Sequence, residues 1–288
     1  MILGVLPTPV SVARRVVRRA RGTSPLRGRT VLITGASSGI GAATARAVAA
    51  QGAHVLLVAR RAAALLELAA EIGDDGGLAS VYPCDLTDFD AIDELVAQVL
   101  DDHGAVDYLV NNAGRSIRRS LHLSYDRFHD VERTMAVNYF GPVRLTMGLL
   151  PAMREQGFGH VVSIVTWGVQ MRAPKFSAYI ASKSALDQWV RIAAREARGD
   201  GVTFTSMRFG LVRTPMVAPT EEYEGRRAMS PEDAARAVVR CLEERPPVWN
   251  IPAGVVGEVV NFLSPRLGDY LMYRYDQMAP DSRAARGG

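Results

Sequence analysis

Short apolar runs alternate along the chain with longer stretches of helical periodicity. Val31-Leu32-Ile33 and Val55-Leu56-Leu57-Val58 are continuous apolar runs, which is typical of strands buried on both faces of a parallel sheet. The alternating order of strands and helices predicts an α/β fold with right-handed crossovers and helices on both faces. Strands are predicted at 30–34, 54–58, 79–82, 106–110, 161–165 and 203–208, with a last one after Pro247.

The sequence predicts where two segments near the end of the chain begin. Ser230-Pro231-Glu232-Asp233 places an N-cap serine before a first-turn proline and two acids, so a helix begins there. After the last predicted strand comes an apolar tail that is interrupted by Pro265. We expect this tail to pack on the domain, to contact another subunit or a membrane, or to close over an apolar substrate.

Composition limits the class of protein. The chain has 288 residues, 48% of them hydrophobic, which suffices for one large α/β domain. Its net charge is +4, but residues 1–28 hold six arginines and no acid, so the remainder carries 4 − 6 = −2. A folded body without a basic surplus argues against nucleic-acid binding.

The basic leader at 1–28 has an amphipathic pattern. Its apolar residues can share one helical face opposite Arg14, Arg15, Arg18 and Arg19. Such a helix could make peripheral contact with an anionic membrane; the alternative is a frayed terminus or a helix docked on the domain. No apolar run reaches the ~18 residues of a spanning helix.

The cysteines and histidines give no sign of a metal or disulfide site. Cys84 and Cys241 are far apart and lack metal-ligand spacing, and the five histidines are scattered. This usage is expected in a reducing compartment and favours a cytoplasmic location without a metal.

A glycine-rich turn lies between the first strand and the following helix. The segment Thr34-Gly35-Ala36-Ser37-Ser38-Gly39-Ile40-Gly41 leads directly into the helix predicted at 42–51. Glycines let a backbone approach a pyrophosphate, which the helix N-terminus attracts. The sequence therefore predicts a dinucleotide site that involves Gly35, Ser37, Ser38, Gly39, Ile40 and Gly41.

The end of the second strand indicates which dinucleotide binds. An NAD-selective fold usually has an acid about 20 residues after the glycines, but this chain has Ala59-Arg60-Arg61 there. Because no carboxylate would repel a 2′-phosphate, we expect NADPH to be preferred over NADH. Arg60 is predicted to be the main contact and Arg61 a supporting one.

Lysine is almost absent from this arginine-rich chain. There are two lysines against thirty-two arginines, and Lys183 follows Tyr179 by four residues. On a helix this spacing places an ammonium beside a phenol and favours the phenolate. Tyr179 is thus a candidate proton donor.

Together, these motifs resemble the short-chain dehydrogenase/reductase family over roughly residues 29–250. The resemblance implies a single Rossmann-like, doubly wound domain with a seven-stranded parallel sheet, between the leader and an extension at 251–288. It also implies that Asp85 meets the adenine, that Asn138 anchors a water in the proton path, and that Thr214 reaches the nicotinamide carboxamide. Further cofactor-binding residues are implied at Leu86, Asn112, Ala113, Gly114, Val212, Tyr179 and Lys183.

The chain departs from the family pattern at two places. Thr166 stands thirteen residues before Tyr179, where the family normally has serine, and we expect it to act as the catalytic hydroxyl. Phe209-Gly210 replaces the usual Pro-Gly after the sixth strand. Threonine retains the hydroxyl that can hold a carbonyl oxygen, although its side chain is stiffer.

The segments at 112–120 and 211–220 also resemble the reductase domain of bacterial long-chain fatty acyl-CoA reductases. Arg115, Arg118 and Arg119 could then bind coenzyme A phosphates, or form a solvated or oligomer-facing cluster. The resemblance implies NADPH-dependent reduction of an acyl-CoA by a homo-dimer or homo-tetramer. Alternatives are a reductase of other hydrophobic ketones or alcohols, and a non-catalytic NADPH-binding sensor or scaffold.

Overall fold

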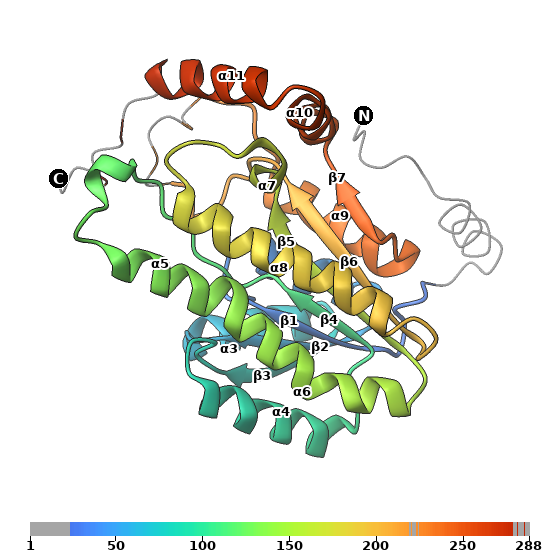
Figure 1. Cartoon of the computed structure of the whole chain (residues 1–288). Coiled ribbons are helices and arrows are strands. Elements are labelled where there is room, and N and C mark those ends of the chain that lie inside the picture. The colour runs from blue at the N-terminus through green and yellow to red at the C-terminus, as the bar shows by residue number, and fades with distance from the viewer. Residues whose placement is uncertain are drawn as a thin grey trace.

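The computed structural model describes residues 24–218, 220, 223, 225–278, 281 and 285. Its centre is one sheet of seven parallel strands in the order β3-β2-β1-β4-β5-β6-β7, which confirms the predicted fold (Figure 1). The strands are β1 (Thr30–Thr34), β2 (His54–Ala59), β3 (Leu78–Pro83), β4 (Tyr108–Asn111), β5 (Gly159–Thr166), β6 (Val202–Phe209) and β7 (Val248–Asn250).

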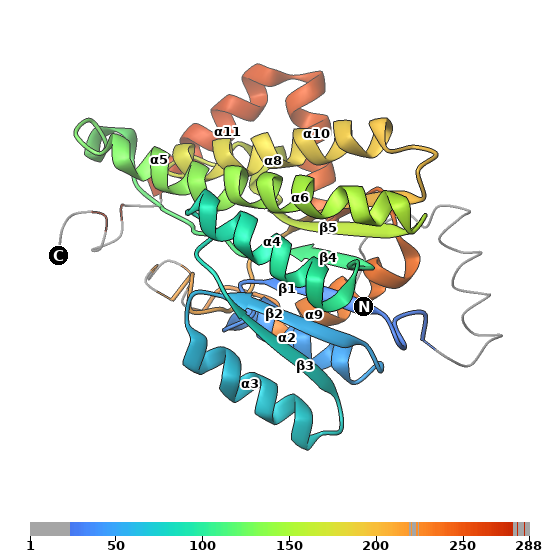
Figure 2. The ribbon, with the colours of Figure 1, turned by 90° about the horizontal axis from the view of Figure 1, so that it is seen from below.

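Helices cover both faces of the sheet, as Figure 2 shows from below. One face carries α2 (Gly39–Ala49), α3 (Ala62–Asp74) and α9 (Pro231–Glu244), and the other α4 (Phe89–His103), α6 (Gly141–Glu155) and α8 (Ser177–Glu196). The remaining helical elements are η1 (Leu121–Leu123), α5 (Phe128–Met135), the π turn η2 (Ala136–Phe140), α7 (Gly168–Met171), α10 (Pro252–Leu263) and α11 (Pro265–Met278).

The continuous apolar strands supply two separate cores. In β1, Val31 and Ile33 belong to the core under α2, α3 and α9, whereas Leu32 belongs to the core under α4, α6 and α8. All three side chains are fully buried. Because successive strand residues point to opposite faces, a strand covered on both sides has no polar face, and this explains its unbroken apolar sequence.

The strand order predicts a ligand-binding cleft at the carboxyl ends of the central strands β1 and β4. After β3 the chain returns to β4 on the other side of β1, so the connections after β1 and β4 diverge there. In open α/β sheets, ligands bind outside the carboxyl ends of the strands at such a switch point. The glycine-rich turn follows β1 directly and therefore lies at this position.

The segments near the two ends of the chain agree in part with the predictions from the sequence. Ser230 caps α9 as predicted, because its hydroxyl accepts a hydrogen bond of 3.0 Å from the Asp233 amide. The apolar tail forms α10 and α11, while residues 1–23 of the predicted amphipathic leader lie outside the described residues. None of the helices in the described part of the chain has the length and apolar character needed to cross a bilayer.

A buried ion pair fixes α8 on the sheet. The Arg208 guanidinium, on β6, donates to both carboxylate oxygens of Asp187 at 3.1 and 2.8 Å. Both side chains are at most 5% exposed. Since the pair is shielded from water and joined through two hydrogen bonds, removal of Arg208 would leave the buried Asp187 without this cation, and removal of Asp187 would leave Arg208 with the half-exposed Glu258 carboxylate 3.4 Å away as its ion-pair partner.

We expect Asp187→Ala to lower the free energy of unfolding by about 3–5 kcal/mol, the usual cost of breaking a buried pair. Urea denaturation would measure this loss. The matched control is Asp93→Ala, which removes an exposed bidentate pair with Arg144 and is expected to change stability little. Equal losses of unfolding free energy in the two variants would show that the buried pair stabilises the fold no more than the exposed pair does.

Candidate active site

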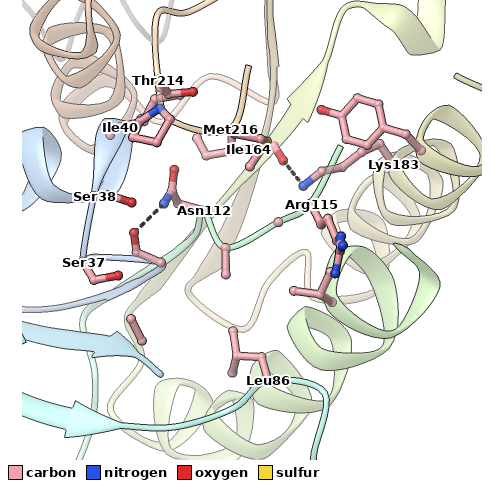
Figure 3. A pocket seen from close by; sticks show the side chains of 18 of the residues that line it. Ser37, Ser38, Ile40, Leu86, Asn112, Arg115, Ile164, Lys183, Thr214 and Met216 are labelled. Atoms are coloured by element: carbon pink, nitrogen blue, oxygen red, sulfur yellow. Dashed lines mark hydrogen bonds between the residues drawn. The ribbon is translucent and has the colours of Figure 1, made fainter. Parts of the chain in front are cut away.

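The glycine-rich turn is locked against the end of β4. Thr34 Oγ1 accepts hydrogen bonds of 3.0 Å from the backbone amides of both Asn112 and Ala113. In return, Asn112 Nδ2 donates to the Thr34 carbonyl oxygen at 2.9 Å and, more weakly, to that of Gly35 (Figure 3). The two loops predicted to line the cofactor cleft are thus one hydrogen-bonded unit.

The tight contact between these loops explains two of the glycines. Gly35 has φ +66°, and a Cβ there would lie 2.9 Å from Ala113 Cα. A Cβ on Gly41 would overlap the Gly35 carbonyl and lie 2.6 Å from Asn112 Nδ2. The two loops, here called the glycine cradle, can therefore lie in this close contact only because neither position carries a side chain.

Above this cradle lies a cleft with a volume of about 870 Å³. This size suits a large organic ligand. Of the predicted site residues, Gly41 and Asn138 do not line the cleft. Thr214 packs over the glycine-rich turn, with its Cγ2 3.1 Å from the position that a Cβ on Gly39 would take. The predicted site residues on the wall are Gly35, Ser37, Ser38, Gly39, Ile40, Arg60, Arg61, Asp85, Leu86, Asn112, Ala113, Gly114, Thr166, Tyr179, Lys183, Val212 and Thr214.

The two arginines after β2 hold different positions. Arg61 Nη2 donates to the Ser37 carbonyl and hydroxyl at 3.2 and 3.1 Å, so this guanidinium lies against the glycine-rich turn. The Arg60 side chain is 74% exposed and has Nη1 3.6 Å from an Asp85 carboxylate oxygen. Burial opposes ionisation of Asp85, but hydrogen bonds from Thr87 and the charge of Arg60 lower its pKa.

At the inner end of the cleft, the hydroxyl of Thr166 meets the phenol of Tyr179. Thr166 Oγ1 accepts a hydrogen bond of 3.1 Å from the Gly168 amide and is hydrogen-bonded to the Tyr179 hydroxyl. The backbone bond orients the threonine, and its proton can then be donated toward the phenol. A Cβ on Gly168 would lie 3.3 Å from Thr166 Oγ1, so this turn has little space to spare.

Lys183 is buried beneath the phenol-bearing turn of α8. Its Nζ donates to the Ile164 carbonyl oxygen on β5 at 2.9 Å (Figure 3). Burial disfavours the ammonium and lowers the pKa of Lys183 to about 8. Threonine, tyrosine and lysine are therefore gathered at one end of the cleft from two elements, β5 and α8.

The structure differs from the expectation that the ammonium lowers the phenol pKa. Burial raises the pKa of Tyr179 to about 12, the hydrogen bond from Thr166 opposes this rise, and the electrostatic influence of Tyr223 adds to it. In the protein alone, desolvation of the phenolate outweighs any stabilisation by Lys183. Tyr179 thus keeps its proton across the physiological range.

Asn138 supports the site through a π turn between α5 and α6. Its Oδ1 accepts from the Arg115 amide at 2.8 Å, and its Nδ2 donates to the Arg115 carbonyl and to Ser182 Oγ, both at 2.9 Å. Ser182 Oγ in turn donates to the Tyr179 carbonyl oxygen at 2.7 Å. The side chain predicted to anchor a water therefore has protein partners on both of its polar atoms and joins the cleft loop to α8.

Sequence reasoning missed Ser182 and Gly168 as supports of the site. Ser182 stands three residues after Tyr179, and this spacing on a helix was the available signal. Nothing in the sequence indicates that Gly168 donates to Thr166, because this bond depends on how the chain turns after β5.

The predicted arginine cluster is divided in the structure. Arg115 is exposed on the cleft wall, whereas Arg118 and Arg119 are not among the described residues that line it. Arg119 lies 3.2 Å from an Asp130 carboxylate oxygen and donates to the Ala285 carbonyl at 2.6 Å. A shared phosphate site of all three arginines is therefore not formed. Among the described residues, no group of three histidine, cysteine or carboxylate side chains has the proximity needed to hold a metal.

Comparison with known proteins identifies the family. The profile described as short chain dehydrogenase matches residues 29–225. The chain is 47% identical over 262 residues to a fatty acyl-CoA reductase of Acinetobacter baylyi, covering 91% of this chain and 89% of that one. It is also 43% identical over 277 residues to a fatty acyl-CoA reductase of Mycobacterium tuberculosis, covering 96% and 94%.

A solved metagenomic short-chain oxidoreductase in complex with NADP is similar in structure. Its TM-score is 0.67 at 33% identity, covering 77% of this chain and 93% of that one. The chain belongs to the short-chain dehydrogenase family and is an oxidoreductase, as its motifs predicted.

We expect Gly41→Ala to weaken dinucleotide binding, because its methyl group would push the Gly35 carbonyl into the cradle. A tenfold or larger rise in the NADPH dissociation constant, roughly 1.4 kcal/mol, should appear in fluorescence titrations. Gly73→Ala is the matched control, since a Cβ there meets no atom within 4 Å. Unchanged affinity in Gly41→Ala would contradict the close-packed cradle.

Proposed function

We propose that the protein is an NADPH-dependent reductase that converts a long-chain fatty acyl-CoA to the fatty aldehyde and coenzyme A. The observation that carries the proposal is the hydrogen-bonded pair of Tyr179 and Thr166 at the inner end of the cleft, above the buried Lys183. The two fatty acyl-CoA reductases among its relatives support the substrate class.

Several observations support NADPH as the cofactor. The glycine cradle fits a pyrophosphate at the N-terminus of α2. Arg60 and Arg61 lie at the carboxyl end of β2, where the chain has two guanidinium groups in place of the acid typical of an NAD site, and Arg60 faces the nearby Asp85 carboxylate. The NADP complex of the metagenomic neighbour agrees with this choice. When bound, NADPH supplies the hydride.

The chain's own residues handle the proton and the carbonyl oxygen. Thr166 donates a hydrogen bond to that oxygen, held in place by the Gly168 amide. Tyr179 transfers its proton to the oxygen as negative charge develops there. The Lys183 ammonium then stabilises the resulting phenolate, and its bond to the Ile164 carbonyl keeps it in reach.

With a thioester, this step gives a hemithioacetal whose carbon has gained the hydride and whose oxygen has gained the phenol proton. Breaking of the carbon–sulfur bond then releases the aldehyde, and the hydroxyl proton goes to the departing thiolate. Arg115 and Arg133 on the cleft wall are suited to the phosphates of the leaving coenzyme A, while Met216 and Val217 offer apolar contact to the acyl chain.

A substrate panel tests the reaction. With NADPH, we expect the protein to oxidise the cofactor when offered long-chain acyl-CoA, and to release free thiol and aldehyde in equal amounts, each measured separately. Turnover of ketones or 3-oxoacyl substrates alone would favour the alternative reductases. Tight NADPH binding without turnover of any carbonyl would favour a non-catalytic sensor. The predicted dimer or tetramer remains a separate expectation.

In the same assay, Tyr179→Phe should lower kcat roughly 10²- to 10⁴-fold, the usual contribution of a positioned acid. NADPH binding should persist, since the ring is retained. Tyr125→Phe, at a side chain 76% exposed, serves as the control. Full activity of correctly folded Tyr179→Phe would exclude the phenol as the proton donor.

The pH profile provides another test. Reduction needs both the phenol proton and the ammonium, and the pKa values are about 12 for Tyr179 and about 8 for Lys183. Because only Lys183 titrates near neutrality, kcat/KM should be level below pH 8 and should fall above it. Lys183→Met should lose this step along with most activity. A wild-type profile that stays level to about pH 10 would contradict the role of the ammonium.

A further inference from the structure

The helix α10 has its small and polar residues turned toward the domain. Gly254 is buried, and a Cβ there would lie 3.1 Å from Gln170 Cδ. One turn further on, a Cβ on Gly257 would lie 3.2 Å from Met171 Cε. These glycines let α10 pack closely against α7 with almost no apolar burial of its own side chains.

The polar side chains of α10 also bond inward. Glu258, which is the only charged residue of this helix, accepts from Gln170 Nε2 at 2.7 Å and from Arg208 Nη1 at 3.4 Å. Asn261 Nδ2 donates to the Gln170 carbonyl at 2.9 Å. A surface helix of a water-soluble domain normally does the reverse and buries its apolar stripe.

The apolar side chains of α10 and α11 consequently point outward and form one surface, here called the tail surface. Phe262 is 84% exposed and Leu263 is 74% exposed. A contiguous group of this kind marks a contact with another molecule rather than ordinary surface variation. The exposed members are Val255, Val256, Val259, Phe262, Leu263, Leu267, Tyr270, Leu271, Tyr273 and Met278.

The tail surface lies at the same end of the molecule as the cleft. The helix α10 follows β7 at the carboxyl edge of the sheet and packs against α7, which begins two residues after Thr166 (Figure 1). In the other direction, α11 is tied down by an ion pair of 2.6 Å between Asp276 and Lys175, four residues before Tyr179. Whatever the tail surface binds is therefore held beside the cleft.

We propose that the tail surface docks on an anionic lipid bilayer. The exposed face of α10 is apolar except at its margin, where Glu258 is 53% exposed although it is bonded to Gln170 and Arg208, and Phe262 and the tyrosines suit the boundary between headgroups and acyl chains. Arg266 and Arg274 are exposed on α11 against one exposed acid, Asp269, since Asp276 is paired with Lys175. Counted with Glu258, the exposed charges of the tail surface cancel, so this surface itself offers the bilayer an apolar contact without net repulsion from anionic headgroups.

The charge of the leader points to the same partner. Residues 1–28 hold six arginines and no acid, so the chain carries a cationic segment in addition to the apolar tail surface. Two weak anchors, one apolar and one electrostatic, together give membrane binding that neither gives alone. A second copy of the chain would bring the same cationic leader and would gain no charge attraction.

Vesicle flotation of the full chain tests this proposal. We expect binding to vesicles of phosphatidylcholine mixed with phosphatidylglycerol, and weaker binding to phosphatidylcholine alone. The double substitution Phe262→Ser and Leu263→Ser should lower the partition coefficient onto these vesicles roughly a hundredfold, because two large apolar side chains no longer enter the bilayer. Leu66→Ser with Leu78→Ser is the matched control, at side chains 60% and 66% exposed on other elements.

Each outcome bears on the proposal. Thermal unfolding and NADPH titration would verify that both double variants fold. The proposal fails if wild-type protein does not bind either vesicle, or if Phe262→Ser with Leu263→Ser binds as well as wild type, which would assign binding to the leader. Sedimentation without lipid covers the remaining case: a dimer abolished by this variant, with unchanged vesicle binding, would assign the tail surface to a second copy. None of these results depends on the proposed substrate.

Discussion

The geometry of the active site depends on how α8 buries its charges. Lys183 and Asp187 stand four residues apart on the side of the helix that meets the sheet, and both are almost fully buried. A buried charge needs a partner at a fixed place. The Ile164 carbonyl on β5 holds the lysine, and Arg208 on β6 holds the aspartate. Because these partners come from adjacent strands, α8 cannot slide or rotate without losing one of them, and Tyr179 is fixed in consequence.

The same burial sets the protonation of the site. Without a bound dinucleotide, desolvation keeps the proton on Tyr179 and weakens the hold of Lys183 on its own proton. Both shifts share their largest cause, which is the burial of the two groups at the inner end of the cleft. With its phenol protonated, the site can donate the proton that the proposed reduction requires.

The sequence predicted most of what depends on local pattern. Unbroken apolar runs such as Val55–Val58 located the strands, and the cap at Ser230 located α9, because these signals lie within a few residues. The glycine turn and the Tyr179–Lys183 spacing were readable for the same reason, and the structure brings them to one cleft.

Contacts between segments that are far apart in the chain could not be predicted from the sequence. Arg119 appeared available for phosphate, but it pairs with Asp130 and the Ala285 carbonyl, which lies 166 residues away. The pKa of the Tyr179 phenol depends mainly on its burial, and the four-residue spacing of Tyr179 and Lys183 does not reveal how deeply the phenol is buried. The apolar tail was visible, yet its outward orientation follows from Gly254, Gly257 and the inward bonds of Glu258, which only the fold reveals.

The near absence of lysine has a consequence for the chemistry of the whole chain. Its only two ε-amines are Lys175, whose side chain is 8% exposed and paired with Asp276, and Lys183 inside the cleft. Acylating or reductively alkylating reagents, which coat most proteins indiscriminately, find few targets here. Since a weakly held proton makes an amine nucleophilic, Lys183 is the group that such reagents would seek once inside the cleft. Of the two ε-amines, Lys183 would thus report by its labelling whether a reagent can enter the cleft.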